Sequence, residues 1–210
     1  MNIERTLIYN TFPAIHGIRN SYNSWEDCDS QGVSIYENDT GWASYNHCLI
    51  GTKDLKLMGS LVKAGSSHRK FLRQIFVCVD LKLPVFVWQE MDTYKISTVR
   101  NSCSTMHTIT HRTLTQEDFE YKIDELTLYK INSFILLYQS EQSSDAKEKI
   151  FLTIKNMLPS GFLQKATMTF DYETLLNIYH QRKNHRLPQW HKVCDWIKTL
   201  PLMEFIIEEK

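Results

Sequence analysis

The sequence predicts an α+β fold in a single domain spanning residues 1–210, with substantial helix content. The strand signal is clearest from Val77 to Lys82, where apolar and polar side chains alternate. The helix signal is the recurrence of apolar residues every three or four positions in several longer segments. A length of 210 residues, 42% of them hydrophobic, is enough for one well-buried core and too short for two large domains.

The first 50 residues combine one predicted strand with a long polar segment. We expect residues 3–9 to form an edge strand that ends before Pro13. Residues 18–48 are rich in Ser, Asn, Asp and Gly without a clear period, so we expect a long loop with short ordered pieces. The aromatic residues of this loop argue against disorder, and its acidic residues lack the spacing of an EF-hand calcium loop.

The chain after residue 50 has clearer start and stop signals. A helix is predicted over residues 54–64, with Asp54 or Thr52 as its N-terminal cap and Gly65 at its end. Pro84 closes the predicted strand at residues 77–82.

The remaining elements are mostly helical. Helices are expected at residues 85–94, 116–121, 126–139, 146–157, 172–182 and 189–199, and an extended segment at residues 165–170. Asp171 is expected to cap the helix that begins at Tyr172, and an acidic tail follows Pro201.

Composition argues against several classes of protein. The 24 basic residues balance the 24 acidic ones, and a nucleic-acid binder would usually show a basic surplus. No apolar run approaches the roughly 18 residues that span a bilayer, and the N-terminus lacks the apolar core of a secretory signal. Five cysteines, an odd number without Cys-x-x-Cys spacing, are typical of reduced thiols. We therefore expect a cytoplasmic protein that binds neither membranes nor nucleic acid.

Residues 93–107 hold an unusual density of side chains that form hydrogen bonds. Buried polar groups must be paired, so a plain core has little use for them. Two interpretations stay open: a polar surface strand and turn, or a segment that wraps an anionic or heteroaromatic ligand.

The sequence carries few signs of a metal site or of a nucleophile. The Thr-Ile-Thr between His107 and His111 favours a strand, and the histidines near Asp195 form no zinc pattern, so no metal is expected. Cys103, between two serines, could act as a nucleophile with His107, but an inert thiol is the preferred interpretation. A glycine-rich phosphate loop is absent from the sequence.

A basic cluster at the end of the helix predicted over residues 172–182 is more suggestive. It comprises Arg182, Lys183, His185 and Arg186. Guanidinium groups there could hold a phosphate bidentately, or the charge could simply stabilise a helix C-terminus.

The stretches HRKFLR, KLPVF, DTYKISTVRNSCS, LP and IYHQR occur in an order and spacing that resembles the flavin-dependent thymidylate synthases, the ThyX family. The resemblance covers residues 51–201 and is strongest to divergent phage-type members. It implies a central antiparallel sheet flanked by helices. It also implies reductive methylation of dUMP, or a related pyrimidine nucleotide, at C5. FAD would be the cofactor, methylenetetrahydrofolate and NADPH the co-substrates, and the protein a homotetramer, in the host cytoplasm if phage-encoded.

The resemblance also assigns roles to residues. His68 falls on a family histidine, and the same register puts Thr93-Tyr94-Lys95 on the flavin signature Arg-His-Arg. His68 and Arg182 are implied as catalytic. Cofactor contacts are implied for His68, Tyr94, Lys95, Thr98, Asn101 and Ser102, and substrate contacts for Lys155, Arg182, Cys103 and Ser104. Because only one basic residue stands in the signature, an alternative is kept: a catalytically degenerate ThyX-like protein that binds a nucleotide or a partner without flavin chemistry.

Overall fold

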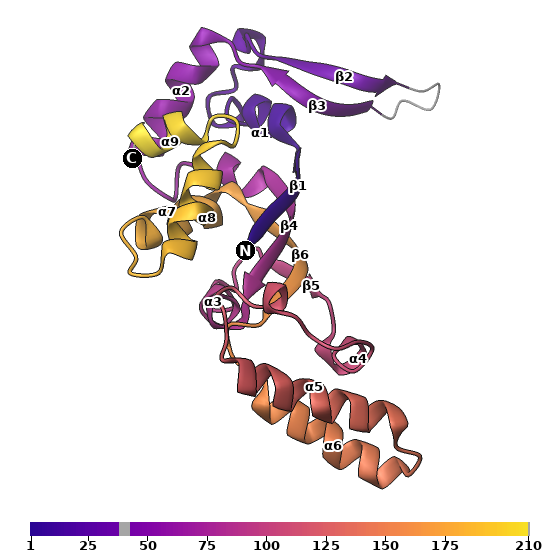
Figure 1. Ribbon diagram of the computed structural model, residues 1–210. Coiled ribbons are helices and arrows are strands. Elements are labelled where there is room, and N and C mark those ends of the chain that lie inside the picture. Colours follow the sequence, from indigo (N-terminus) through magenta and orange to yellow (C-terminus); the bar gives the residue numbers. More distant parts are fainter. Residues whose placement is uncertain (38–42, 210) are drawn as a thin grey trace. The chain divides into compact units, whose positions relative to one another are not determined.

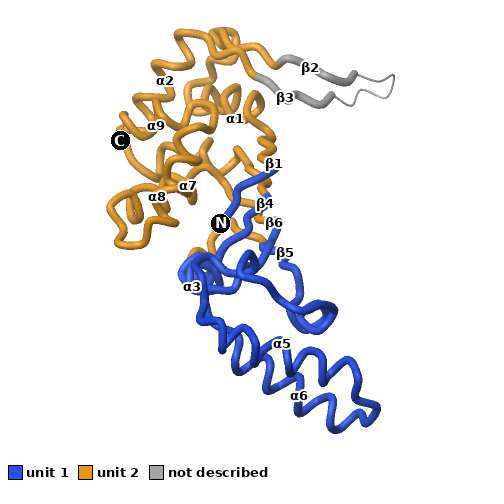
Figure 2. The backbone as a smooth tube through the Cα atoms, viewed as in Figure 1, with its two compact units in different colours: residues 1–4, 80–93, 100–167 blue, residues 5–79, 94–99, 168–210 orange. Residues whose placement is uncertain are grey.

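The computed structural model describes the backbone of residues 1–37 and 43–209, and the side chains of these residues outside positions 33–47. The chain divides into two compact units whose segments alternate along the sequence (Figure 2). Unit 1 comprises residues 1–4, 80–93 and 100–167, and unit 2 comprises residues 5–79, 94–99 and 168–210. The single domain expected from the sequence stays a prediction.

Four strands form an antiparallel sheet in the order β1-β4-β6-β5 (Figure 1). They are β1 (Asn2–Tyr9), β4 (Phe76–Pro84), β5 (Val99–Ser102) and β6 (Leu163–Asp171). Strand β4 is buried along most of its length because it lies between two neighbours, whereas β1 is largely exposed at the sheet edge. The predicted edge strand, the strand that ends at Pro84 and the extended segment at 165–170 are confirmed, each slightly longer than expected.

Unit 2 contains most of the helices. They are α1 (Thr11–Gly17), α2 (Thr52–Lys63), α7 (Tyr172–Arg182), α8 (Pro188–Lys198) and α9 (Met203–Glu209), with 3-10 turns at Asn20–Tyr22, Trp25–Asp27 and Lys70–Gln74. The predicted helices at 54–64, 172–182 and 189–199 are therefore confirmed. The acidic tail predicted after Pro201 is wrong in part, because residues 203–209 form helix α9, in which the side chains of Met203 and Ile206 are buried.

The expected long loop at residues 18–48 is wrong in part: residues 18–30 hold only short 3-10 turns, as expected, residues 31–37 and 43–48 do not form a loop, and residues 38–42 lie outside the described residues. Strands β2 (Gln31–Glu37) and β3 (Ala43–Leu49) pair antiparallel there, with Gln31 opposite Leu49. The polar composition concealed the pair because a two-stranded ribbon has no need of a fully apolar face.

Helix α2 is capped by a residue distant in sequence. The Asp29 carboxylate accepts hydrogen bonds from the backbone N–H groups of Lys53 (2.9 Å) and Asp54 (3.0 Å), which replaces the predicted cap by Asp54 or Thr52. The Asp54 side chain is instead fully buried and accepts 2.7 Å from Nε of Arg19. Gly65 ends the helix as expected, with a φ of 99° that favours glycine.

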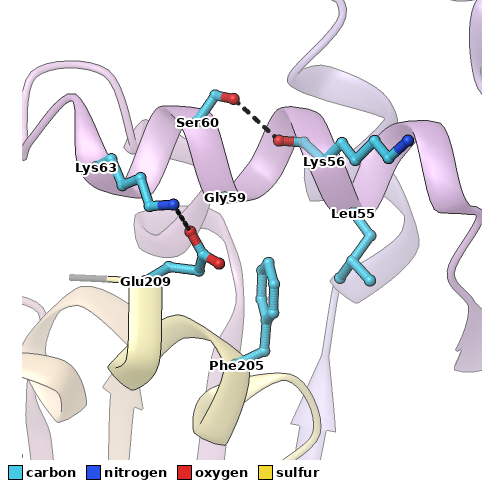
Figure 3. Close-up of a pocket in the computed structure, with 7 residues that line it drawn as sticks. All are labelled: Leu55, Lys56, Gly59, Ser60, Lys63, Phe205 and Glu209. Carbon is cyan, nitrogen blue, oxygen red and sulfur yellow. Dashed lines mark hydrogen bonds and ion pairs between the residues drawn. The ribbon is translucent and has the colours of Figure 1, made fainter.

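Helix α9 packs on α2 at a glycine (Figure 3). A Cβ added to Gly59 would lie 3.2 Å from both the Phe205 ring and the Glu209 carboxylate, so these two side chains would have to shift by a few tenths of an ångström to admit it. Lys63 on α2 pairs with Glu209 at 2.6 Å.

A buried ion pair ties two distant segments of unit 2 together. Arg69, just before the turn at residues 70–74, donates from Nε and from a terminal nitrogen to the two carboxylate oxygens of Glu173, each at 2.8 Å. Only 5% of Arg69 and 7% of Glu173 are exposed. The bidentate geometry satisfies both charged groups away from water.

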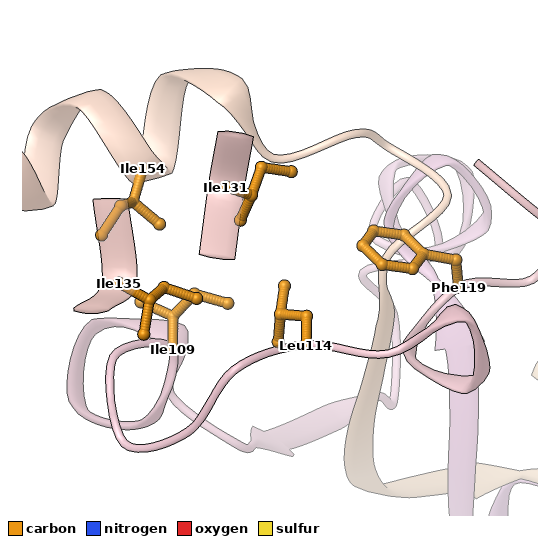
Figure 4. Packing of buried hydrophobic residues seen from close by; sticks show 6 residues of the cluster. All are labelled: Ile109, Leu114, Phe119, Ile131, Ile135 and Ile154. Carbon is orange, nitrogen blue, oxygen red and sulfur yellow. The ribbon is translucent and has the colours of Figure 1, made fainter. Parts of the chain in front are cut away.

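Unit 1 is built around a helical hairpin. Its helices are α3 (Val85–Met91), α4 (Thr105–Thr108), α5 (Glu125–Ser140) and α6 (Ser144–Met157). Six buried residues form its core (Figure 4): Ile109, Leu114, Phe119, Ile131, Ile135 and Ile154. The predicted helices at 85–94, 126–139 and 146–157 are confirmed, the first ending earlier than expected.

Two predictions in unit 1 are wrong. Residues 116–121 form only a 3-10 turn at Gln116–Asp118, because Asp118 turns back to accept 2.8 Å from the backbone N–H of Thr115. The segment of His107 and His111 is not a strand, because helix α4 begins at Thr105. Within the described residues, no helix is long and apolar enough to cross a bilayer.

Candidate functional site

Helix α7 places Arg182 at its C-terminal end. The predicted N-terminal cap is confirmed, since the Asp171 carboxylate accepts 2.7 Å from the backbone N–H of Thr174. Residues 171–176 are buried, so the helix is firmly held at its start. Cations are favoured at its other end by the helix dipole, where His180 and Arg182 lie in the last turn.

The turn that carries Tyr94 is fixed by three local features. Thr98 donates 2.6 Å to the Tyr94 carbonyl, and Thr174 of α7 donates 3.0 Å to the Ile96 carbonyl. Ser97 adopts a φ of 53°, a left-handed conformation that a non-glycine residue adopts at some cost. The turn leaves Lys95 exposed at its surface.

Tyr94 and Arg182 meet directly, although they are 88 residues apart. Nε of Arg182 donates 2.8 Å to the Tyr94 hydroxyl, and that hydroxyl donates 3.0 Å to Gln181. The guanidinium carbon also lies 4.7 Å from the centre of the Trp190 ring and 5.6 Å from that of Tyr94. We call Tyr94, Gln181, Arg182 and Trp190 the Arg182 cluster. It holds a half-buried guanidinium beside two aromatic rings whose planes are inclined by 67° to each other.

The chain around the Arg182 cluster is strongly basic. No Asp or Glu occurs between residues 174 and 194, whereas this stretch holds Arg182, Lys183, Arg186 and Lys192 besides three histidines. Lys95, Lys183 and Arg186 are exposed. This concentration of cations favours an anionic ligand.

His68 lies in a different part of unit 2. It is exposed and lines a cavity of about 410 Å³ together with Lys70 and Arg73. The remaining lining residues are polar or apolar and include Asn20 but no carboxylate. The donor set of this cavity, one imidazole with two cations, suits phosphate or carboxylate groups.

The other predicted site residues belong to unit 1. Asn101, Ser102 and Cys103 are exposed and Ser104 is half-buried. Lys155 on α6 donates 2.5 Å to the Thr105 hydroxyl, which joins the end of the hairpin to the start of α4.

Cys103 lines a second cavity of about 250 Å³, whose lining also includes Lys82, Arg112 and Asp118. The hydrogen bond from Arg112 holds the pKa of Asp118 below its usual value. The Cys103 sulfur contacts Thr108 Oγ1 at 3.8 Å, a partner other than the His107 considered from the sequence. Among the side chains that the structure describes, no group of three His, Cys, Asp or Glu could hold a metal ion.

Sequence reasoning did not identify the partners of the basic residues. Arg100 stacks 4.0 Å over the Trp88 ring and donates to both oxygens of Asp92 (2.9 and 2.7 Å), so it is engaged in holding β5 against α3. Gln181 and Trp190 were likewise not assigned to Arg182. Helical spacing could not have found Trp190, because it lies on the next helix, α8.

The fold places the chain in a recognisable class. Its antiparallel sheet of four strands with flanking helices is similar to the fold of solved structures of the flavin-dependent thymidylate synthase ThyX. This agrees with the fold predicted from the sequence resemblance.

Two solved structures carry the comparison. One is ThyX from Helicobacter pylori in complex with FAD and dUMP, with a TM-score of 0.70, 16% identity and coverage of 100% of this chain and 99% of that chain. The other is a structure of ThyX from Helicobacter pylori with FAD and dUMP at 2.31 Å, with a TM-score of 0.67, 14% identity and coverage of 98% and 100%. No protein-family sequence model matches the chain, and no curated protein sequence matches it. At this level of identity the likeness establishes the fold alone.

Proposed function

We propose that the chain is a ThyX-type enzyme that binds dUMP or a related pyrimidine nucleotide and methylates its base reductively at C5. The observation that carries the proposal is the Arg182 cluster. It offers a fixed guanidinium beside two aromatic rings, inside a segment without carboxylates, on the fold of structures solved with dUMP and FAD.

The nucleotide phosphate is assigned to Arg182 and Lys95. The Tyr94 contact fixes the guanidinium plane before any ligand arrives, so little side-chain entropy is lost on binding. Lys95 follows Tyr94 directly in the sequence and adds an exposed ammonium group next to the Arg182 cluster in the chain. Charge-assisted hydrogen bonds of this kind contribute about 1.5–3 kcal/mol each.

The flavin or the folate is assigned to the cavity of His68. Its cations, Lys70 and Arg73, and its lack of carboxylates fit the phosphates of a dinucleotide or the carboxylates of a folate. When bound, reduced FAD supplies the reducing chemistry, with NADPH as the source of hydride and methylenetetrahydrofolate as the carbon donor. The contribution of the protein is to orient these molecules and to neutralise their charge. Lys155, Cys103, Ser104, Asn101 and Ser102 of unit 1 stay candidates for further contacts.

A second function is favoured by one specific observation. At the signature position only Lys95 is basic, and the Tyr94 hydroxyl and ring are engaged by Arg182. A lysine cannot make the bidentate contact of an arginine. The second candidate is therefore a protein that binds a nucleotide or a partner through this fold without flavin chemistry.

The decisive experiment combines a spectrum with calorimetry. The absorption spectrum of the purified protein, before and after addition of FAD, reports flavin binding directly. Titration with dUMP, compared with deoxyuridine, reports whether the phosphate is recognised. We expect dUMP to bind at least tenfold more tightly than deoxyuridine, since the phosphate supplies the contacts to Arg182 and Lys95.

Variants assign the site. Arg182→Ala should weaken dUMP binding roughly 10- to 100-fold, in line with the loss of a charge-assisted hydrogen bond. Lys198→Ala is the matched control, because this exposed cation of the same unit pairs with Asp195 on the far end of α8. Equal binding of dUMP and deoxyuridine would contradict the nucleotide site. Nucleotide binding without a flavin spectrum or dTMP formation would select the second candidate.

A further inference from the structure

The turn at residues 94–99 belongs to unit 2, although the chain on either side of it belongs to unit 1. Residues 95–97 at its centre are exposed, so their side chains contribute little packing. A segment with few buried apolar contacts has low local stability unless hydrogen bonds hold it. The hydrogen bonds that connect this turn to the rest of unit 2 therefore decide where its side chains lie.

Two points on helix α7 hold the turn. At the C-terminal end of the helix, Gln181 and Arg182 contact the Tyr94 hydroxyl. Near the N-terminal end, the Thr174 hydroxyl donates 3.0 Å to the Ile96 carbonyl. Residues 174 and 182 are about 12 Å apart along the helix, at a rise of about 1.5 Å per residue. The turn therefore follows α7 and is attached near both ends of it.

Thr174 is the rigid partner in its contact with Ile96. It is only 6% exposed, and its backbone N–H donates 2.7 Å to the Asp171 carboxylate that caps the helix. Ile96, in contrast, is 81% exposed. A buried donor on a capped helix has a fixed position, whereas an exposed turn residue does not. The position of Ile96 therefore depends on Thr174, rather than the reverse.

This hydrogen bond matters because the next residue is strained. Ser97 has a φ of 53°, in the left-handed region that residues other than glycine rarely adopt. The Ile96 carbonyl belongs to the peptide plane that leads into Ser97, so the Thr174 hydroxyl fixes that plane. Without it, we expect Ser97 to relax to a negative φ, a change of roughly 110°. Such a change would move the preceding residues, Tyr94 and Lys95.

We propose that Thr174 is a positioning residue of the nucleotide site. Its hydroxyl keeps the turn on α7, and thereby keeps the Tyr94 hydroxyl on Arg182 and Lys95 at the same end of the helix. The consequence for binding rests on the proposed nucleotide function, whereas the hold on the turn does not. Because Thr174 acts through two cations, its loss should impair recognition of the phosphate of a nucleoside monophosphate and spare recognition of the nucleoside.

Two substitutions separate the hydroxyl of Thr174 from its shape. Thr174→Val keeps the branched shape and removes the donor, whereas Thr174→Ser keeps the donor and removes a buried methyl group. Both keep the backbone N–H that Asp171 caps. A residue that only fills space would be harmed more by serine, since the lost methyl leaves a cavity. The positioning role predicts the opposite order.

Trypsin cleavage reports on the turn without any ligand. Trypsin cuts after lysine, and it reaches Lys95 only when the turn opens. We expect Thr174→Val to speed cleavage after Lys95 about tenfold, as the loss of one hydrogen bond implies, and Thr174→Ser to stay within about twofold of the unaltered chain. Cleavage after Lys122, an exposed loop residue of unit 1, is the internal control and should not change.

Calorimetry with dUMP and deoxyuridine measures the consequence for the site. We expect Thr174→Val to weaken binding of dUMP roughly tenfold and binding of deoxyuridine less than about twofold. Thr174→Ser should retain the preference for dUMP. A general loss of stability would lower both affinities together, so the ratio of the two affinities distinguishes positioning from a merely structural role.

A change within the turn should reproduce the effect. Proline fixes φ near about −65°, which the φ of 53° at Ser97 excludes. We therefore expect Ser97→Pro to lower the affinity for dUMP by about the same factor as Thr174→Val. Combining the two substitutions should add little, because the turn is already released by either one.

Several results would overturn the positioning role. One is an effect of Thr174→Ser as large as that of Thr174→Val. Another is a Thr174→Val variant in which Lys95 stays as protected as before, or in which the turn opens while the preference for dUMP is unchanged. An unaltered chain that binds dUMP no better than deoxyuridine would overturn the proposed nucleotide site instead, and cleavage after Lys95 would still decide whether Thr174 holds the turn.

Discussion

The ion pair between Arg69 and Glu173 gives the sharpest prediction about stability. Removing one partner, as in Glu173→Ala, leaves a guanidinium that is 95% buried without its carboxylate. The attraction is lost while the cost of desolvating the remaining charge stays. Loss of one member of a buried pair typically costs about 3–5 kcal/mol.

Removing both charges should be much less harmful. In Arg69→Met combined with Glu173→Leu, neither side chain must be desolvated as an ion, and similar volumes fill the space. We expect this double variant to lose less than about 2 kcal/mol relative to the unaltered chain. The two single substitutions should therefore be strongly non-additive.

Urea unfolding followed by circular dichroism provides the free energies for the cycle. The Lys198 and Asp195 pair is the control, because these side chains are 43% and 72% exposed at a separation of 3.2 Å. Its removal should cost less than about 1 kcal/mol. A Glu173→Ala cost in that same range, or a double variant whose cost equals the sum of the single ones, would refute the reasoning.

Three further predictions follow from buried groups. Asp54→Asn should destabilise the chain by about 3–5 kcal/mol at pH 7, since it breaks a buried ion pair. Burial opposes ionisation of Asp54, but its hydrogen bonds hold its pKa below the usual value. The ionised carboxylate therefore stabilises the folded chain above about pH 4, and this contribution is lost as the pH falls and the carboxylate is protonated. Urea unfolding at several pH values should show the gap between the two proteins narrowing below pH 4, and a constant gap would contradict this. Tyr172→Phe should cost about 1–2 kcal/mol in thermal unfolding, because the fully buried hydroxyl donates 2.9 Å to the Pro201 carbonyl and would leave it unpaired. Burial raises the pKa of Cys194 to about 11, so a thiol reagent at pH 8 should label exposed Cys103 well before Cys194, as mass spectrometry of the digested protein can establish.

The fold was predictable where local chemistry and periodicity agree. Helix α7 begins at the predicted residue because Asp171 is both a good cap and the end of a strand. Strand β4 was recognisable because Pro84 ends a run of alternating residues. Strands β2 and β3 and helix α9 were missed because polar or acidic composition outweighed short apolar patterns in the sequence.

The candidate site was less predictable because its contacts join distant segments. Nothing in the local sequence around Tyr94 indicates that Arg182 will meet its hydroxyl, and nothing around Asp54 indicates that Asp29 will take over its role as a cap. The resemblance indicated Arg182 as important but could not assign Trp190 and Tyr94 as its aromatic neighbours. Side-chain identity suggests the chemistry of a residue, whereas its partners depend on the tertiary fold.

The alternation of the two units along the chain has a consequence for dissecting the protein. The chain passes between units five times, after residues 4, 79, 93, 99 and 167, and strands β1, β4, β5 and β6 contain four of these passages. No single continuous fragment includes one unit without part of the other. Neither unit can therefore be exchanged or inherited as a module, and a protease cut within one of these strands would damage both units together.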